Sequence, residues 1–96
     1  MAYSDDFRWS GSSVREVLCR LGYEKFEGSG WNENFEMWML DGDEETVVQI
    51  PLKEEASDYQ FLCDACINQL MRQSLTSVES MYKVSKTLIS VKYPGI

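Results

Sequence analysis

The sequence predicts an α+β fold, a two-layer domain of order α-β-β-β-α-α in which a three-stranded antiparallel sheet carries helices on one face. Three observations lead to this prediction. A helical repeat of apolar residues opens the chain, alternating runs joined by an Asp-Gly pair occupy its middle, and two further helical repeats close it. The length of 96 residues suits a single domain, residues 1–96.

The first helix is predicted over residues 14–21, where apolar residues recur on one helical face. Ser13 and Glu16 have the spacing of a capping box, and Gly22 suits the position that follows a helix. Residues 1–11 lack such a repeat, so we expect an irregular N-terminal arm there. The apolar stripe of the helix consists of Val14, Val17, Leu18 and Leu21.

Three strands are predicted next, at residues 23–27, 34–40 and 46–52. The first turn, Gly28-Ser29-Gly30, contains two glycines, which adopt positive φ at little cost. The second connection, residues 41–45, is a hairpin loop with an Asp-Gly signal. Pro51 lacks a backbone N–H, so it indicates the end of a strand or a sheet edge.

The second strand alternates, so its two faces carry different side chains. We expect the face against the helices to hold Phe35, Met37 and Met39. We expect the solvent-exposed face to hold Glu36, Trp38 and Leu40. Trp38 is therefore predicted to be an exposed aromatic residue beside an acidic one.

Two helices are predicted after the sheet, near residues 58–72 and from Thr76 onward, and Ser57 with Gln60 and Thr76 with Glu79 have capping-box spacing. The apolar face of the first holds Tyr59, Leu62, Cys63, Cys66, Ile67 and Leu70. That of the second holds Val78, Met81, Tyr82, Ser85, Leu88 and Ile89. Residues 90–96 are expected to form a short C-terminal tail. The predicted core includes Leu18, Leu21, Phe35, Met37, Leu62 and Leu70.

The charge is strongly negative and unevenly distributed. The formal net charge is −7, yet residues 24–64 hold twelve carboxylates against Lys25 and Lys53, while the chain from Arg72 onward has a net charge of +3. Phosphate contacts supply most of the affinity of nucleic-acid-binding proteins, so this balance argues against nucleic acid as a partner. It favours a basic protein partner, although acidity also serves solubility alone.

The three cysteines do not indicate a disulfide framework, and the N-terminus resembles no secretory signal, so we expect a reduced, cytoplasmic protein without membrane association. Cys63 and Cys66 form a CxxC pair at helical i, i+3 spacing. Burial in the core is favoured over a metal or redox role, because only Cys19 could add a further soft ligand. The acidic loop 41–45 lacks the ligand spacing of a calcium site. No cofactor or metal is expected.

The candidate site is a binding patch on the solvent-exposed sheet face. A large aromatic residue there would anchor a protein partner or a second copy of the chain, unless the N-terminal arm or the C-terminal tail covers it. The patch is predicted to consist of Trp31, Glu33, Glu36, Trp38 and Leu40.

Residues 12–81 resemble the HicA-type toxins, small mRNA-cleaving members of toxin–antitoxin pairs. The run SSVREVLCRLGYEKFEGSG resembles the opening of that family, with Leu18–Gly22 followed by Tyr23 at the helix end and Gly28-Ser29 at its Gly-Ser-His motif. VVQIP at 47–51 resembles its third strand, and YQFLCDACINQL the helix that follows. The resemblance implies a double-stranded-RNA-binding-domain-like fold of order α-β-β-β-α.

The chain departs from that family at the residue that carries its chemistry. The resemblance implies a catalytic histidine after Gly28-Ser29, yet this position is Gly30 and the sequence contains no histidine. Glu33 and Glu36 are near in sequence, but an exposed carboxylate is a poor acid at neutral pH and is not expected to replace the histidine. The favoured function is therefore a non-catalytic acidic interaction protein on a HicA-like scaffold. The alternatives are a HicA-like ribonuclease that uses other residues and an acidic nucleic-acid mimic, such as a phage counter-defence protein.

Overall fold

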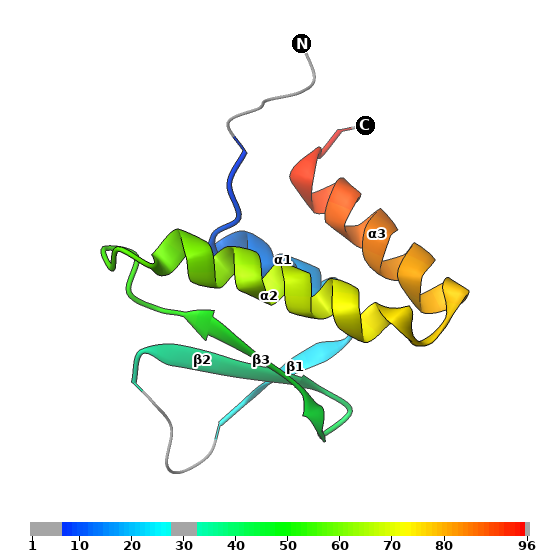
Figure 1. Ribbon diagram of the computed structural model, residues 1–96, viewed down its shortest axis with the longest axis horizontal. Helices are drawn as coiled ribbons and strands as arrows, with labels where there is room; N and C mark the ends of the chain where they lie inside the picture. Colours follow the sequence, from blue (N-terminus) through cyan, green and yellow to red (C-terminus); the bar gives the residue numbers. More distant parts are fainter. Residues whose placement is uncertain (1–6, 28–32, 96) are drawn as a thin grey trace.

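The computed structural model describes residues 7–27 and 33–95, and its elements follow the order α-β-β-β-α-α (Figure 1). The elements are α1 (Gly11–Arg20), β1 (Tyr23–Phe26), β2 (Phe35–Leu40), β3 (Asp43–Pro51), α2 (Tyr59–Gln73), the 3-10 helix η1 (Ser74–Thr76) and α3 (Val78–Lys92). The three strands form one antiparallel sheet of order β1-β2-β3. The predicted α+β fold and antiparallel meander are confirmed.

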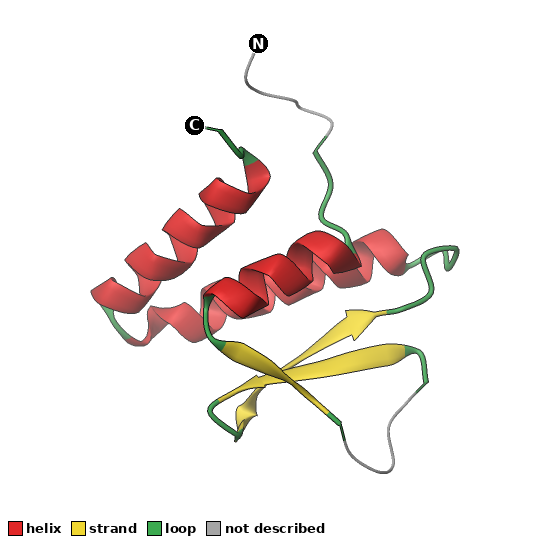
Figure 2. Cartoon of the chain, turned by 180° about the vertical axis from the view of Figure 1, so that it is seen from behind, coloured by secondary structure: helices red, strands yellow, loops and turns green. Residues whose placement is uncertain are grey.

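The helices lie on one side of the sheet, as the two opposite views show (Figures 1 and 2). Helix α1 packs on β1 and β3, and α2 packs along β3. Helix α3 packs against α1 and α2 and lies farther from the sheet (Figure 1). No helix or strand among the described residues covers the opposite face of the sheet.

The β2–β3 hairpin is tighter than predicted. Asp41 and Gly42 have φ of 52° and 73°, the positive values that both central residues of a type I′ turn require, so β3 begins at Asp43. Thr46 joins the two strands beyond the turn, because its Oγ1 accepts the Leu40 N–H at 2.9 Å and donates to the Asp43 carbonyl at 2.7 Å. Pro51 ends β3, an outer strand, as predicted.

The first helix begins earlier than predicted. Ser10 is the N-cap residue of α1 and forms a capping box with Ser13, whose side chain accepts the Ser10 N–H at 2.9 Å. The prediction of a box between Ser13 and Glu16 is therefore wrong, and Glu16 instead pairs with Arg20 at 2.6 Å. Gly22, with φ of 89°, follows the helix as predicted.

The later helices also use different caps. The N-cap of α2, Asp58, makes no side-chain capping bond, and Gln60 donates to the Trp9 carbonyl instead of forming a box with Ser57. Ser77 caps α3 by accepting the Ser80 N–H, in place of the predicted Thr76–Glu79 pair. Helix α3 continues to Lys92, so the segment predicted as a tail is helical at its start.

The core lies between the sheet and the helices. The buried cluster consists of Val14, Val17, Leu18, Leu21, Tyr23, Trp38, Val48, Ile50, Cys63, Cys66, Ile67, Leu70 and Val91. Leu18, Leu21 and Leu70 are buried as predicted. Phe35, Met37 and Leu62 are only partly buried, which corrects half of the predicted core.

The faces of β2 are reversed relative to the prediction. Trp38 is only 8% exposed and belongs to the core cluster, and Leu40 packs against that cluster, so Glu36, Trp38 and Leu40 face the helices. The alternation itself was predicted correctly, but the exposed position predicted for Trp38 is wrong. The physical reason is that Glu36 is neutralised by partners on neighbouring elements, so an acidic residue is compatible with the covered face.

Candidate functional site

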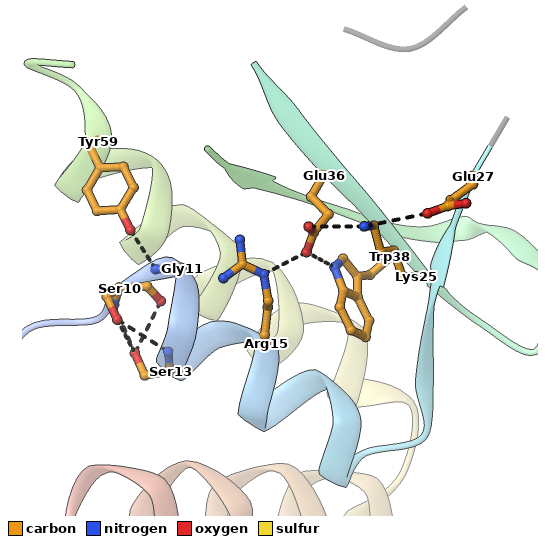
Figure 3. A network of polar contacts seen from close by, with 9 residues as sticks. All are labelled: Ser10, Gly11, Ser13, Arg15, Lys25, Glu27, Glu36, Trp38 and Tyr59. Carbon is orange, nitrogen blue, oxygen red and sulfur yellow. Dashed lines mark hydrogen bonds and ion pairs between the residues drawn. The ribbon is translucent and has the colours of Figure 1, made fainter. Parts of the chain in front are cut away.

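Glu36 is the centre of a polar network that joins α1, β1 and β2 (Figure 3). Its Oε1 accepts hydrogen bonds from Arg15 Nε at 2.7 Å and from Trp38 Nε1 at 2.8 Å. Its Oε2 lies 3.5 Å from Lys25 Nζ, which also lies 3.6 Å from Glu27 Oε1. The Glu36 side chain is only 13% exposed. The cations Arg15 and Lys25 together with the Trp38 N–H replace the water that its carboxylate has lost.

Local geometry explains why these residues meet. Glu36 and Trp38 are two positions apart on one strand and therefore share a face. Lys25 is the cross-strand partner of Trp38, so it lies diagonally across from Glu36. Arg15 follows the buried Val14 on α1 and reaches down to the sheet. The indole N–H of a buried tryptophan needs an acceptor, and Glu36 supplies it.

The network is not suited to proton transfer at neutral pH. Burial alone would raise the pKa of Glu36, but the hydrogen bonds from Arg15 and Trp38 and the charges of Arg15 and Lys25 outweigh burial and lower that pKa. The carboxyl therefore stays ionised near neutrality, and arginine does not exchange its proton in this range. These residues connect α1 to strands β1 and β2 of the sheet, and they do not resemble a general acid–base pair.

The CxxC cysteines are buried in the core, as predicted. Burial raises the pKa of Cys63, and it raises the pKa of Cys66 to about 12, so neither thiol forms a thiolate at neutral pH. Cys66 Sγ lies 3.1 Å from the Gln49 carbonyl and donates to it. Within residues 7–27 and 33–95, no group of three or more His, Cys, Asp or Glu residues could hold a metal ion.

The outer edge of β3 is occupied by side chains of α2. Gln69 Nε2 donates to the Val47 carbonyl at 2.6 Å. Two residues further along β3, the Gln49 carbonyl accepts the hydrogen bond from Cys66. Gln69 and Cys66 lie three positions apart on the helix, so they project toward the same edge. These contacts occupy carbonyls that another strand would need, and sequence reasoning did not identify this role.

The exposed side of the sheet carries apolar residues of β1 and β2. Cross-strand partners share a face, and Phe26 pairs with Met37, which pairs with Gln49 on β3. Glu24 pairs with Met39 on the same side. We name this surface the open sheet face and define it by Glu24, Phe26, Phe35, Met37, Met39 and Gln49.

Apolar exposure on the open sheet face is concentrated at one end. Phe26 is 42% exposed and Met37 is partly exposed, and together with Leu52 and Glu33 they line a shallow groove of about 240 Å³. Met39 is buried, yet it lies outside the core cluster between sheet and helices. The face therefore presents a small apolar surface with a polar surround.

The surround of the open sheet face is acidic. Glu24, Glu27 and Glu33 are exposed, and so are four carboxylates at the β2–β3 turn, namely Asp41, Asp43, Glu44 and Glu45. Lys25 lies nearby, but Glu36 and Glu27 already contact its ammonium. The charge of Lys25 is therefore partly balanced by these two carboxylates, and the exposed carboxylates outnumber it around the face.

Among the described residues, the structure brings only two of the predicted patch residues, Glu33 and Glu36, to one surface groove. Both side chains line this groove, whereas Trp38 and Leu40 pack on the core beneath the helices. Trp31 and the turn Gly28-Ser29-Gly30 lie outside the described residues. Sequence reasoning missed Phe26 and Glu24, although the alternation of Tyr23, Glu24, Lys25 and Phe26 contained the signal.

The chain matches no family model, no curated protein and no solved structure. Among residues 7–27 and 33–95, no helix combines the length and apolar character needed to cross a bilayer.

Proposed function

We propose that this protein is a non-catalytic acidic interaction protein whose open sheet face binds a basic protein partner. The observation that carries the proposal is the exposed Phe26 beside the partly exposed Met37, on a face that no described helix or strand covers and near exposed carboxylates. Interfaces commonly combine an apolar centre with a polar rim. Here the rim is acidic, so a partner with Lys or Arg around an apolar centre would complement it.

The scaffold is part of the same proposal. The order α-β-β-β-α that the HicA-type resemblance implies agrees with α1 through α2. The position of the family's histidine is Gly30, and no histidine elsewhere in the sequence could replace it. Because Glu36 is held ionised and Cys63 and Cys66 are held protonated, the described groups favour binding over RNA cleavage.

A binding assay with defined peptides tests the proposal. Fluorescence anisotropy would compare a labelled peptide of alternating Lys and Leu with one of alternating Glu and Leu, and with a single-stranded RNA. We expect the basic peptide to bind and its affinity to fall as salt is raised, because exposed charges are screened. We expect no binding of the acidic peptide or the RNA.

Variants distinguish peptide binding at the open sheet face from a general attraction of the basic peptide to an acidic protein. Phe26→Ser and Glu24→Lys should each weaken peptide binding, by about fivefold or more for an anchor and a rim charge of ordinary strength. Phe61→Ser is the matched control, since Phe61 is also an exposed aromatic residue but lies on α2. Equal loss in Phe26→Ser and Phe61→Ser would reject the open sheet face. Binding or cleavage of the RNA would favour the ribonuclease alternative instead.

A further inference from the structure

Helix α3 has two apolar faces, and only one of them packs on the protein. Val84 and Leu88 pack against the core cluster and Val91 is part of it. On a second side of the helix, Val78, Tyr82 and Ile89 are 76%, 66% and 56% exposed. Of the apolar residues predicted for this helix, Leu88 packs on the core while Val78, Tyr82 and Ile89 are exposed.

The exposed residues have a regular spacing. Val78, Tyr82, Ser85 and Ile89 are separated by steps of four, three and four, which is the heptad seam of helices that pack side by side. At 3.6 residues per turn they fall within about 60° of arc, centred about 120° around the helix from the core side. We name these four residues the α3 stripe.

Two opposite charges lie beside the stripe on a single flank. Glu79 and Lys86 are seven residues apart, so they occupy equivalent positions of successive heptads, and both are exposed. Lys86 Nζ lies 5.8 Å from the centre of the Tyr82 ring, which keeps the ammonium beside the stripe. The flank is therefore acidic near the start of α3 and basic one heptad later.

We propose that the α3 stripe binds the α3 stripe of a second copy of this chain, with the two helices antiparallel about a two-fold axis. In an antiparallel pair the same flanks of the two helices face each other. If Val78 lies opposite Ile89 of the second copy, Tyr82 lies opposite Ser85, so a large side chain meets a small one. The same register brings Glu79 opposite Lys86, and the two-fold axis forms this ion pair twice.

The positions of Glu79 and Lys86 favour a second copy of the chain as the partner, and they favour the antiparallel orientation of the two helices. A parallel pair would place Tyr82 against Tyr82 and would leave Glu79 and Lys86 facing the opposite flank, where Met81 and Leu88 stand. A uniformly charged partner, basic or acidic, would attract one of the two residues and repel the other. A second copy in antiparallel register attracts both residues, because Glu79 of each helix then faces Lys86 of the other.

The proposed contact is separate from the open sheet face. Helix α3 lies on the helical side of the molecule and away from the sheet (Figure 1). Self-association through α3 therefore leaves the open sheet face of each copy free, and one assembly would present two such faces.

Sedimentation equilibrium on the full chain over a wide concentration range tests the proposal. We expect a monomer–dimer equilibrium with a dissociation constant below about 1 mM, within the weak range of specific association. Glu79→Lys and Lys86→Glu should each weaken the dimer about tenfold, because each turns two exposed attractive pairs into repulsive ones. The double variant should restore the wild-type constant, because the pairs are rebuilt with reversed charge.

Two further variants complete the experiment. Ile89→Ser should abolish the dimer without loss of the core, since Ile89 is exposed, while Phe61→Ser on α2 should leave it unchanged. Circular dichroism and thermal unfolding confirm that each variant is folded. A monomer at every concentration up to about 1 mM would overturn the proposal. So would a dimer that the single charge variants leave unchanged, or a double variant as weak as the single ones.

Discussion

Arg15 Nε donates to Glu36 Oε1 at 2.7 Å, and this contact fixes α1 to the middle strand of the sheet. The same oxygen accepts the indole N–H of Trp38 at 2.8 Å (Figure 3). One carboxylate therefore pairs with the Arg15 cation and also supplies the hydrogen-bond acceptor for the buried Trp38. The pair explains how an acidic residue occupies the helix-covered side of the sheet.

Glu36→Ala should therefore destabilise the protein. The change leaves Trp38 Nε1 without its acceptor and Arg15 without its partner, which costs about 2–4 kcal/mol of the free energy of unfolding. Urea denaturation measures this loss. Glu33→Ala is the control, since Glu33 is exposed, and should change stability by less than about 0.5 kcal/mol. A loss of similar size in both variants would contradict the role given to the network.

Acid should weaken the same contact. Because the pKa of Glu36 in the folded protein lies below its ordinary value of 4.5, the unfolded chain binds this proton first as pH falls. The stabilisation from Glu36 is present above pH 4.5 and is lost as pH falls below that value toward the folded pKa. Urea midpoints measured between neutrality and acid should fall less steeply in Glu36→Gln than in the wild type. Identical slopes would show that Glu36 does not contribute.

The three thiols should differ in reactivity. Cys19 is exposed, whereas Cys63 and Cys66 are buried with raised pKa values. A thiol reagent at mildly alkaline pH should therefore label one cysteine rapidly and two only after unfolding in urea. Cys19→Ser identifies the fast phase. Rapid labelling of two or three thiols in the native protein would contradict the burial of the CxxC pair.

Trp38→Ala should remove much of the stability of the fold. Deleting a buried tryptophan costs about 3–5 kcal/mol, a large share of the total for a small domain. Trp38→Phe should cost less, because the ring is largely kept and only the N–H and part of the volume are lost. Thermal unfolding followed by circular dichroism distinguishes the two. A fully stable Trp38→Ala variant would mean that Trp38 is not part of the core.

The sequence predicts the strands and their alternation because turn residues and apolar periodicity are local. The hairpin loop and the strand that ends near Pro51 were predicted, but the Asp41-Gly42 turn is shorter than the predicted loop 41–45, so β3 begins three residues earlier than predicted. The direction that Trp38 faces was not predictable in this way. It depends on Arg15, 21 positions before Glu36, and a single strand's alternation carries no information about such a partner.

The exposed residues of the sheet were predicted less well than the fold for a related reason. Once the faces of β2 are assigned wrongly, Trp38 and Leu40 are predicted on the face opposite to the one that they occupy. Phe26 becomes a candidate only when its pairing with Met37 is known. The exposure of the α3 stripe was not predictable from the sequence either, because its apolar residues resemble those of any helix that packs on a core.

The side chains that occupy the outer edge of β3 have a consequence for fibril formation. Cross-β fibrils grow without limit only when a sheet accepts new strands at both of its edges. In this sheet β1 and β3 are the outer strands, and Gln69 and Cys66 already bind the carbonyls that an incoming strand would use on β3. Strand addition at β1 alone would join two molecules edge to edge and would then stop, so the two contacts on β3 oppose unlimited strand addition.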